Sequence, residues 1–142
     1  MSENIDKLIK IDPYSLIPEE KNTLFMKCIS ESIKFHYENC AEYQHYCKKK
    51  NFHPDNIINL SHIPYLPVDI FKKMTLLSVP KSEIIKILKS SATTSNLPSV
   101  IHLDKKTANR QMISLNSIIC NFLGNDKMNF IILDNKKSLE ST

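Results

Sequence analysis

Glycine is almost absent from this chain of 142 residues, and its scarcity restricts the turns that the chain can build. The single glycine is Gly124, whereas average usage predicts about ten in a chain of this length. Glycine most readily adopts the positive φ of tight turns and of loops that approach a phosphate closely. The chain must therefore build its connections from Asn, Asp, Ser and its seven prolines, or contain few tight turns.

Two long segments have the apolar spacing of amphipathic helices. The first covers residues 18–50, with a break expected near Asn39, because Pro18 suits the first helical position. In the second, Asp104 is placed to cap the start and Gly124 to end it. Its apolar side chains recur three or four residues apart, at Ala108, Met112, Leu115, Ile119 and Phe122.

Three short apolar segments predict β-strands, at residues 84–88, 99–103 and 129–134. A strand, a helix and a further apolar strand in this order are typical of a parallel crossover. We therefore expect a mixed α/β fold in one domain, residues 1–142, with a helical N-terminal half followed by a partial, mostly parallel sheet. The sheet is expected to be incomplete, because few residues follow its last predicted strand.

A run of hydroxyl side chains connects the first two predicted strands. Backbone N–H groups and hydroxyls in such a run can donate hydrogen bonds to phosphate oxygens, and Lys89 adds a positive charge just before it. A polar surface hairpin has the same composition, so the residues alone leave both interpretations open. The run consists of Ser90, Ser91, Ala92, Thr93, Thr94 and Ser95.

The composition argues against several classes of protein. The net charge of +4 is modest, and Arg110 is the only arginine, so we do not expect a nucleic-acid partner. No apolar run reaches the roughly 18 residues of a membrane span, and the polar start has no secretory leader. These features predict a cytoplasmic protein.

Four cysteines and five histidines raise the question of a metal site. His36 and Cys40 share one helix face at i, i+4, but no Cys-x-x-Cys motif accompanies them. Cys28 and Cys120 lie in apolar helical segments and are interpreted as small core residues. We expect no bound metal.

The hydroxyl run and its flanking sequence resemble a known family. The order Ser-Ser-Ala-Thr-Thr-Ser is similar to the Ser-Ser-Gly-Thr-Thr-Gly phosphate loop of adenylate-forming enzymes. The flanks narrow the resemblance to LuxE-type acyl-protein synthetases, over most of the chain. The residues that carry it are His36–Cys40, Tyr43, Ile63–Val68, Phe71, Lys72, Leu76–Pro80, Pro98, Ser99, Leu103, Asp104, Thr107 and Gln111.

The resemblance implies an enzyme that uses ATP and Mg²⁺ to activate a fatty acid as an acyl-adenylate. The acyl group would then pass to an enzyme cysteine and on to a partner reductase, as in bioluminescence. The implied nucleotide-binding residues are Lys89, Ser90, Ser91, Ala92, Thr93, Thr94 and Ser95. No cysteine of this chain matches the acyl-accepting position, and the catalytic residues stay unknown.

The chain departs from the family pattern in two ways. Ala92 and Ser95 stand where the family has glycine, so we expect weakened nucleotide binding. The resemblance also covers only the N-terminal portion of a family member, so the isolated chain is expected to be inactive. Two alternatives stay open: a non-catalytic remnant that binds a partner such as a downstream ligase fragment, or part of a coenzyme A ligase for another carboxylic acid.

Overall fold

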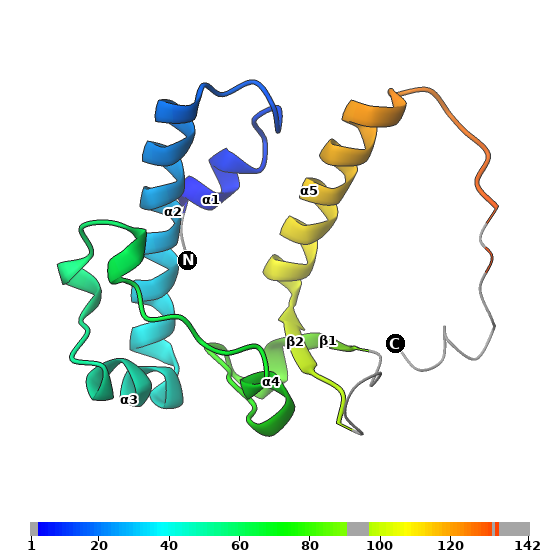
Figure 1. The fold of residues 1–142 in the computed structure, drawn as a ribbon. Coiled ribbons are helices and arrows are strands. Elements are labelled where there is room, and N and C mark those ends of the chain that lie inside the picture. Colours follow the sequence, from blue (N-terminus) through cyan, green and yellow to red (C-terminus); the bar gives the residue numbers. More distant parts are fainter. Residues whose placement is uncertain (1–2, 91–96, 132, 134–142) are drawn as a thin grey trace.

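The computed structural model describes residues 3–90, 97–131 and 133, and it confirms the predicted mixed α/β class. A helical first half leads into a two-stranded sheet, and a long helix follows (Figure 1). Three short 3-10 turns, at Pro54–Asn56, Leu60–His62 and Lys81–Glu83, lie in the connections. The helices are α1 (Glu3–Leu8), α2 (Pro18–Asn39), α3 (Ala41–Lys49), α4 (Ile70–Lys73) and α5 (Lys105–Leu123), and the strands are β1 (Ile84–Lys89) and β2 (Val100–Asp104).

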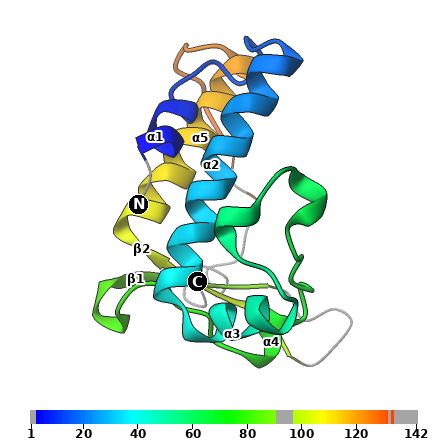
Figure 2. The same ribbon diagram turned by 90° about the vertical axis from the view of Figure 1, so that its left-hand side faces the viewer.

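The break predicted in the first long helix is confirmed. Cys40 separates α2 from α3 with extended backbone angles, φ −127° and ψ 105°. Its N–H still donates to the carbonyl of His36, which closes the last turn of α2. Because the chain turns at this buried residue, α3 packs beside the end of α2 (Figure 2).

Both predicted ends of α5 are also confirmed. The Thr107 N–H donates to Asp104 Oδ1 at 2.5 Å, which caps the start. Gly124 follows the helix with φ +81°, and its N–H donates to the carbonyl of Cys120. Among the described residues only Gly124 and Asn51 have positive φ, so the chain does build its described turns almost without the conformations that favour glycine.

The predicted parallel arrangement of the sheet is wrong. β1 and β2 pair antiparallel, with Ile84 opposite Asp104 and Lys89 opposite Val100. The pairing is irregular between Ile84 and Lys86. The connection runs only from residue 90 to residue 99, whereas a parallel crossover needs about a dozen residues or more. The two strands therefore form a hairpin, and both interpretations of the hydroxyl run that connects them stay open.

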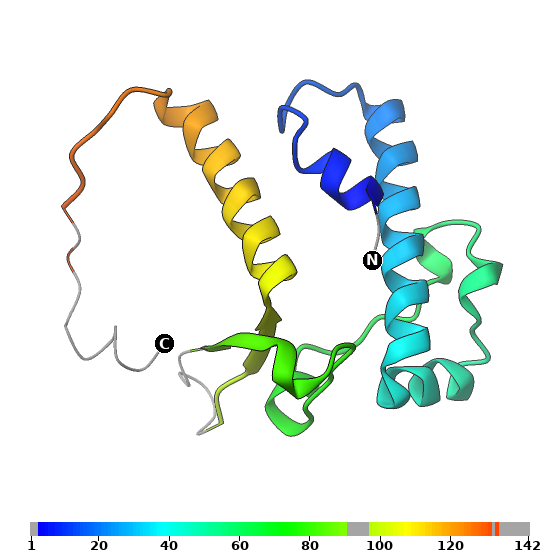
Figure 3. The ribbon, with the colours of Figure 1, turned by 180° about the vertical axis from the view of Figure 1, so that it is seen from behind.

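The third predicted strand does not form in the part of the chain that the structure describes. Residues 129–131 and 133 are irregular, while residues 132 and 134 lie outside the described residues. Residues 124–131, which follow α5, extend away from the helices (Figures 1 and 3). An apolar segment becomes a strand only when a neighbour supplies hydrogen bonds, and the described sheet contains only β1 and β2.

The apolar stripe of α5 lies on the surface rather than in the core. Met112 is 67% exposed and Phe122 is 71% exposed, and Leu115 and Ile119 are also exposed. None of the helices in residues 3–90, 97–131 and 133 is long and apolar enough to span a bilayer. The buried apolar side chains of these residues are Cys28, Ile33, Cys40, Cys47 and Leu103.

An ion pair between distant parts of the sequence joins α1 to α5. The buried Arg110 donates from Nε to Asp6 Oδ1 at 2.7 Å, and Lys106 Nζ lies 3.5 Å from Asp6 Oδ2. The hydrogen bond from Arg110 is the main reason that the pKa of Asp6 falls from 3.8 to about 2. The folded state therefore favours the ionised carboxylate.

We expect Asp6→Asn to lower the melting temperature at neutral pH and to have no effect in strong acid. Because the pKa of Asp6 is lower in the folded state, the pair stabilises the fold above pH 3.8, and this stabilisation is lost as the pH falls through about 2. Thermal unfolding, followed by circular dichroism from neutral pH to strong acid, would measure the difference in melting temperature between the natural chain and the variant. A double-mutant cycle with Arg110→Gln tests whether this difference comes from the Asp6–Arg110 ion pair. A difference that does not change with pH would contradict the expectation.

Candidate functional site

The neck of the hydroxyl loop is held closed by Ser90 and Ser99. The N–H of Ser90 donates to the Ser99 carbonyl at 3.0 Å, and the N–H of Ser99 donates to Ser90 Oγ at 2.9 Å. Ser99 is buried, while Lys89 and Ser90 are exposed. Because Ser90 Oγ accepts this bond, its own O–H is still able to donate to a ligand.

The rest of the predicted phosphate loop follows Ser90 in the sequence. Ser91, Ala92, Thr93, Thr94 and Ser95 lie outside the described residues. The phosphate-binding role of the whole run, Lys89 and Ser90 included, therefore stays a prediction. The structure adds that the run connects two antiparallel strands whose last pair is Lys89 and Val100.

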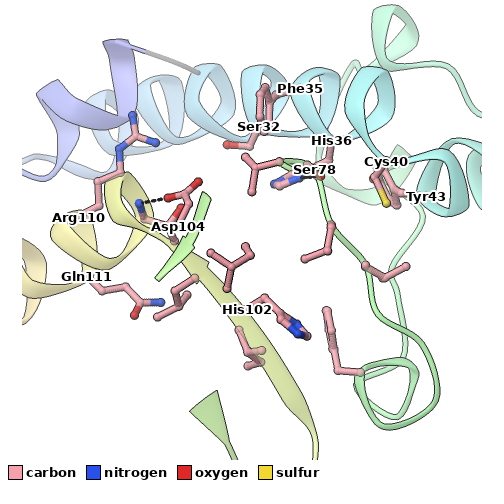
Figure 4. A pocket seen from close by; sticks show the side chains of 18 of the residues that line it. Ser32, Phe35, His36, Cys40, Tyr43, Ser78, His102, Asp104, Arg110 and Gln111 are labelled. Carbon is pink, nitrogen blue, oxygen red and sulfur yellow. Dashed lines mark hydrogen bonds between the residues drawn. The ribbon is translucent and has the colours of Figure 1, made fainter. Parts of the chain in front are cut away.

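A pocket of about 590 Å³ lies between α2, α5, β2 and the segment at residues 66–79 (Figure 4). This volume falls within the roughly 300–1,000 Å³ typical of small-molecule sites. The walls are mainly apolar, and a few polar side chains interrupt them. The apolar lining residues include Phe35, Leu66, Phe71, Leu76, Leu77, Val79, Ile84, Ile101 and Leu103.

The pocket gathers residues that are far apart in the sequence but that carry the family resemblance. α2 contributes His36, and Cys40 and Tyr43 follow at its end. The segment before β1 contributes Leu76–Val79, and the start of α5 contributes Thr107 and Gln111 (Figure 4). These motifs are recognisable in the sequence, but their sequence positions do not predict that they surround one pocket.

One polar contact on the pocket wall joins α2 to the segment before β1. His36 Nδ1 and Ser78 Oγ lie 2.7 Å apart in a hydrogen bond, and the Phe35 ring packs edge-on against the imidazole. Burial lowers the pKa of His36 below its usual 6.5, so the imidazole is neutral at neutral pH. The contact is therefore one between two uncharged groups.

Two further polar groups of the pocket are also held uncharged. Burial raises the pKa of the Cys40 thiol and that of the Tyr43 hydroxyl. The charged residues at the wall have partners, since Arg110 pairs with Asp6 and Asp104 caps α5. The open part of the pocket is thus lined by apolar and neutral groups, which favours an apolar ligand over an anion.

Among the described residues, His36 and Cys40 are not joined by further side chains that would complete a metal site. No group of three or more His, Cys, Asp or Glu side chains comes together there in a way that could hold a metal ion. His36 bonds Ser78 instead, and the Cys40 thiol contacts the carboxylate of Glu42 at 3.5 Å.

Comparison with known proteins places these features in a family. The sequence profile described as "Acyl-protein synthetase, LuxE" matches residues 1–139. The chain belongs to the LuxE family. Its pocket and its hairpin loop are therefore features of a LuxE-family chain, and the resemblance seen in the sequence is confirmed at the level of the family.

Three curated relatives carry the name long-chain-fatty-acid–luciferin-component ligase. The protein from Photorhabdus luminescens is 33% identical over 105 residues, which are 73% of this chain and 89% of that protein. Those from Vibrio harveyi and Aliivibrio fischeri are 28% and 31% identical over 116 residues, 81% of this chain. The matched region spans only 30% of the length of these two ligases. No solved structure matches the chain.

Proposed function

We propose that this LuxE-family chain supplies the ATP-phosphate loop and adjoining pocket of a fatty-acid-activating acyl-protein synthetase. The observation that carries the proposal is the family match over residues 1–139, within which the hydroxyl run forms the connection of the hairpin. The names of the relatives refer to long-chain fatty acids, and we propose the same substrate class for this chain. The chain is proposed to act as one domain in the cytoplasm.

In this proposal the loop holds the triphosphate while the fatty acid attacks. The carboxylate oxygen bonds to the α-phosphorus, the bond from that phosphorus to the bridging oxygen breaks, and pyrophosphate leaves with the electron pair. Hydroxyls of Ser90, Ser91, Thr93 and Thr94 would donate to phosphate oxygens, and Lys89 would offset their charge. Mg²⁺ is expected to enter with the nucleotide, since it is usually held largely by substrate phosphates.

The test of this role is direct binding of MgATP. Thr93→Val with Thr94→Val removes two hydroxyls and keeps the side-chain shapes, so we expect affinity to fall by about tenfold or more. Calorimetric titration of the intact chain measures it. Thr23→Val is the matched control, because the Thr23 hydroxyl donates within α2 to the Glu19 carbonyl at an exposed position. Equal affinity in the loop variant and the natural chain would contradict the proposal.

The identity of the acid and its acceptor is addressed by pyrophosphate exchange. Exchange that depends on a long-chain fatty acid supports the acyl-protein synthetase, whereas exchange that depends on another carboxylic acid supports a coenzyme A ligase. Activity is expected only when the remaining length of the two longer relatives is also represented, because the match spans only 30% of those ligases. No cysteine of this chain matches the acyl-accepting position that the family resemblance implies.

A second candidate function follows from the exposed stripe on α5. Met112, Leu115, Ile119 and Phe122 present apolar side chains along one helix, and Phe130, Ile131 and Leu133 beyond it are also exposed. Exposed apolar surface of this kind is typical of protein contacts. A chain that binds a partner through this surface without binding MgATP would fit the non-catalytic alternative.

A further inference from the structure

The pocket walls identify the kind of ligand that would fit. Apolar side chains come from α2, from the segment at residues 66–79 and from both strands, so a ligand would be surrounded by hydrocarbon on several sides. His36 and Ser78 satisfy each other at 2.7 Å, and the Arg110 guanidinium is bonded to Asp6. A carboxylate or phosphate buried here would lose its hydration without gaining equivalent hydrogen bonds or an ion pair from the wall. Transfer of an alkyl chain from water into the pocket is favourable.

The pocket lies along β2, next to the end of the hairpin from which the hydroxyl loop begins. β2 residues Ile101–Asp104 line the pocket, and the residue before them, Val100, pairs with Lys89 at the entrance to the hydroxyl loop. Figure 4 shows His102 pointing into the pocket from this strand. A ligand lying along β2 would therefore have one end near Lys89 and Val100, the last pair of the hairpin, and the other end among the apolar side chains.

We infer that this pocket binds the alkyl chain of the fatty acid, with the carboxylate directed along β2 toward Lys89 and Ser90. The inference rests on the proposed function, which requires the carboxylate to meet a nucleotide phosphate at the loop. It adds the location of the acyl chain and the side chains that contact it. Burial of the alkyl chain among Phe35, Phe71 and Leu77 supplies the affinity, and the neutral wall excludes the charged end.

The experiment is binding of dodecanoate to the intact chain without ATP, with butanoate as the short-chain comparison. Ser32 lines the pocket from α2, and its hydroxyl donates to the Cys28 carbonyl within the helix. Ser32→Phe places a ring in the pocket, so we expect dodecanoate affinity to fall by about tenfold or more. Thr23→Phe is matched, since Thr23 makes the same kind of bond on the same helix but is exposed, and affinity is expected to be unchanged.

A second pair of variants keeps the test decisive if circular dichroism shows that Ser32→Phe does not fold. Gln111 lines the pocket from an exposed position on α5, whereas Asn109 is exposed on the same helix but does not line it. Gln111→Trp should weaken dodecanoate binding and Asn109→Trp should not. Binding by the pocket-filled variants equal to that of the natural chain, or no preference for dodecanoate over butanoate, would overturn the inference.

The same samples separate this inference from the proposed function. MgATP binding that depends on the loop, without saturable dodecanoate binding, removes the inference and leaves the nucleotide role intact. Dodecanoate binding that Ser32→Phe weakens, without MgATP binding, supports the alkyl site and contradicts the proposed nucleotide role.

Discussion

Leu103→Ala is expected to lower the free energy of unfolding by about 2–5 kcal/mol, the usual range for removing a buried leucine side chain. Leu103 lies on β2, is only 4% exposed and is, with Ile33, the largest of the buried apolar side chains among the described residues. Three of the other buried apolar residues are the cysteines at positions 28, 40 and 47, whose side chains are small. Since small domains are stable by only about 5–15 kcal/mol, this single change is expected to remove a large part of the stability.

Urea unfolding followed by circular dichroism measures this loss, with Ile85→Ala as the control. Ile85 is an apolar residue of β1 that is 60% exposed, so its truncation should change stability by roughly 0.5 kcal/mol or less. Equal effects of the two variants would show that β2 does not contribute to a core. A large effect of Ile85→Ala alone would show that the outward face of β1 is covered in solution.

The features of this fold that depend on a few neighbouring residues could be predicted from the sequence. The Asp104 cap and the Gly124 terminus define α5 locally, and the structure shows both. The break after Asn39 has the same character, because it depends on the chain's change of direction at Cys40. In each case the interacting groups lie within four residues of one another, so both partners of the contact can be recognised in one short stretch of sequence.

The features that depend on distant pairing could not be predicted in this way. The apolar segment at 129–134 looks like a buried strand, but a strand needs a partner, and its period does not show which segment will pair with it. The stripe on α5 has the same origin, because periodicity shows that one face is apolar but not that another element covers it. The pocket was missed since it brings His36, Ser78 and Gln111 together from three separate segments.

The second large expected effect concerns the hydroxyl loop. Replacing Ala92 and Ser95 with the glycines found in the family pattern is expected to raise the affinity for MgATP. Where a loop takes the positive φ that glycine allows, a side chain costs about 1–2 kcal/mol per residue, which corresponds to roughly five- to thirty-fold in affinity. Removing the two Cβ atoms also lets the backbone N–H groups approach the phosphate oxygens.

Calorimetric titration of MgATP against the natural chain and the Ala92→Gly, Ser95→Gly variant measures this gain. Ala41→Gly, at the exposed start of α3, is the control for a general effect of added glycine and should leave the affinity unchanged. The gain is expected only if the hydroxyls of the same loop contact the phosphates, so it should disappear when Thr93→Val and Thr94→Val are added. Tight binding by the natural chain with no gain in the glycine variant would show that the loop does not need those conformations. The lysine and hydroxyl groups would then have to account for binding without close backbone approach.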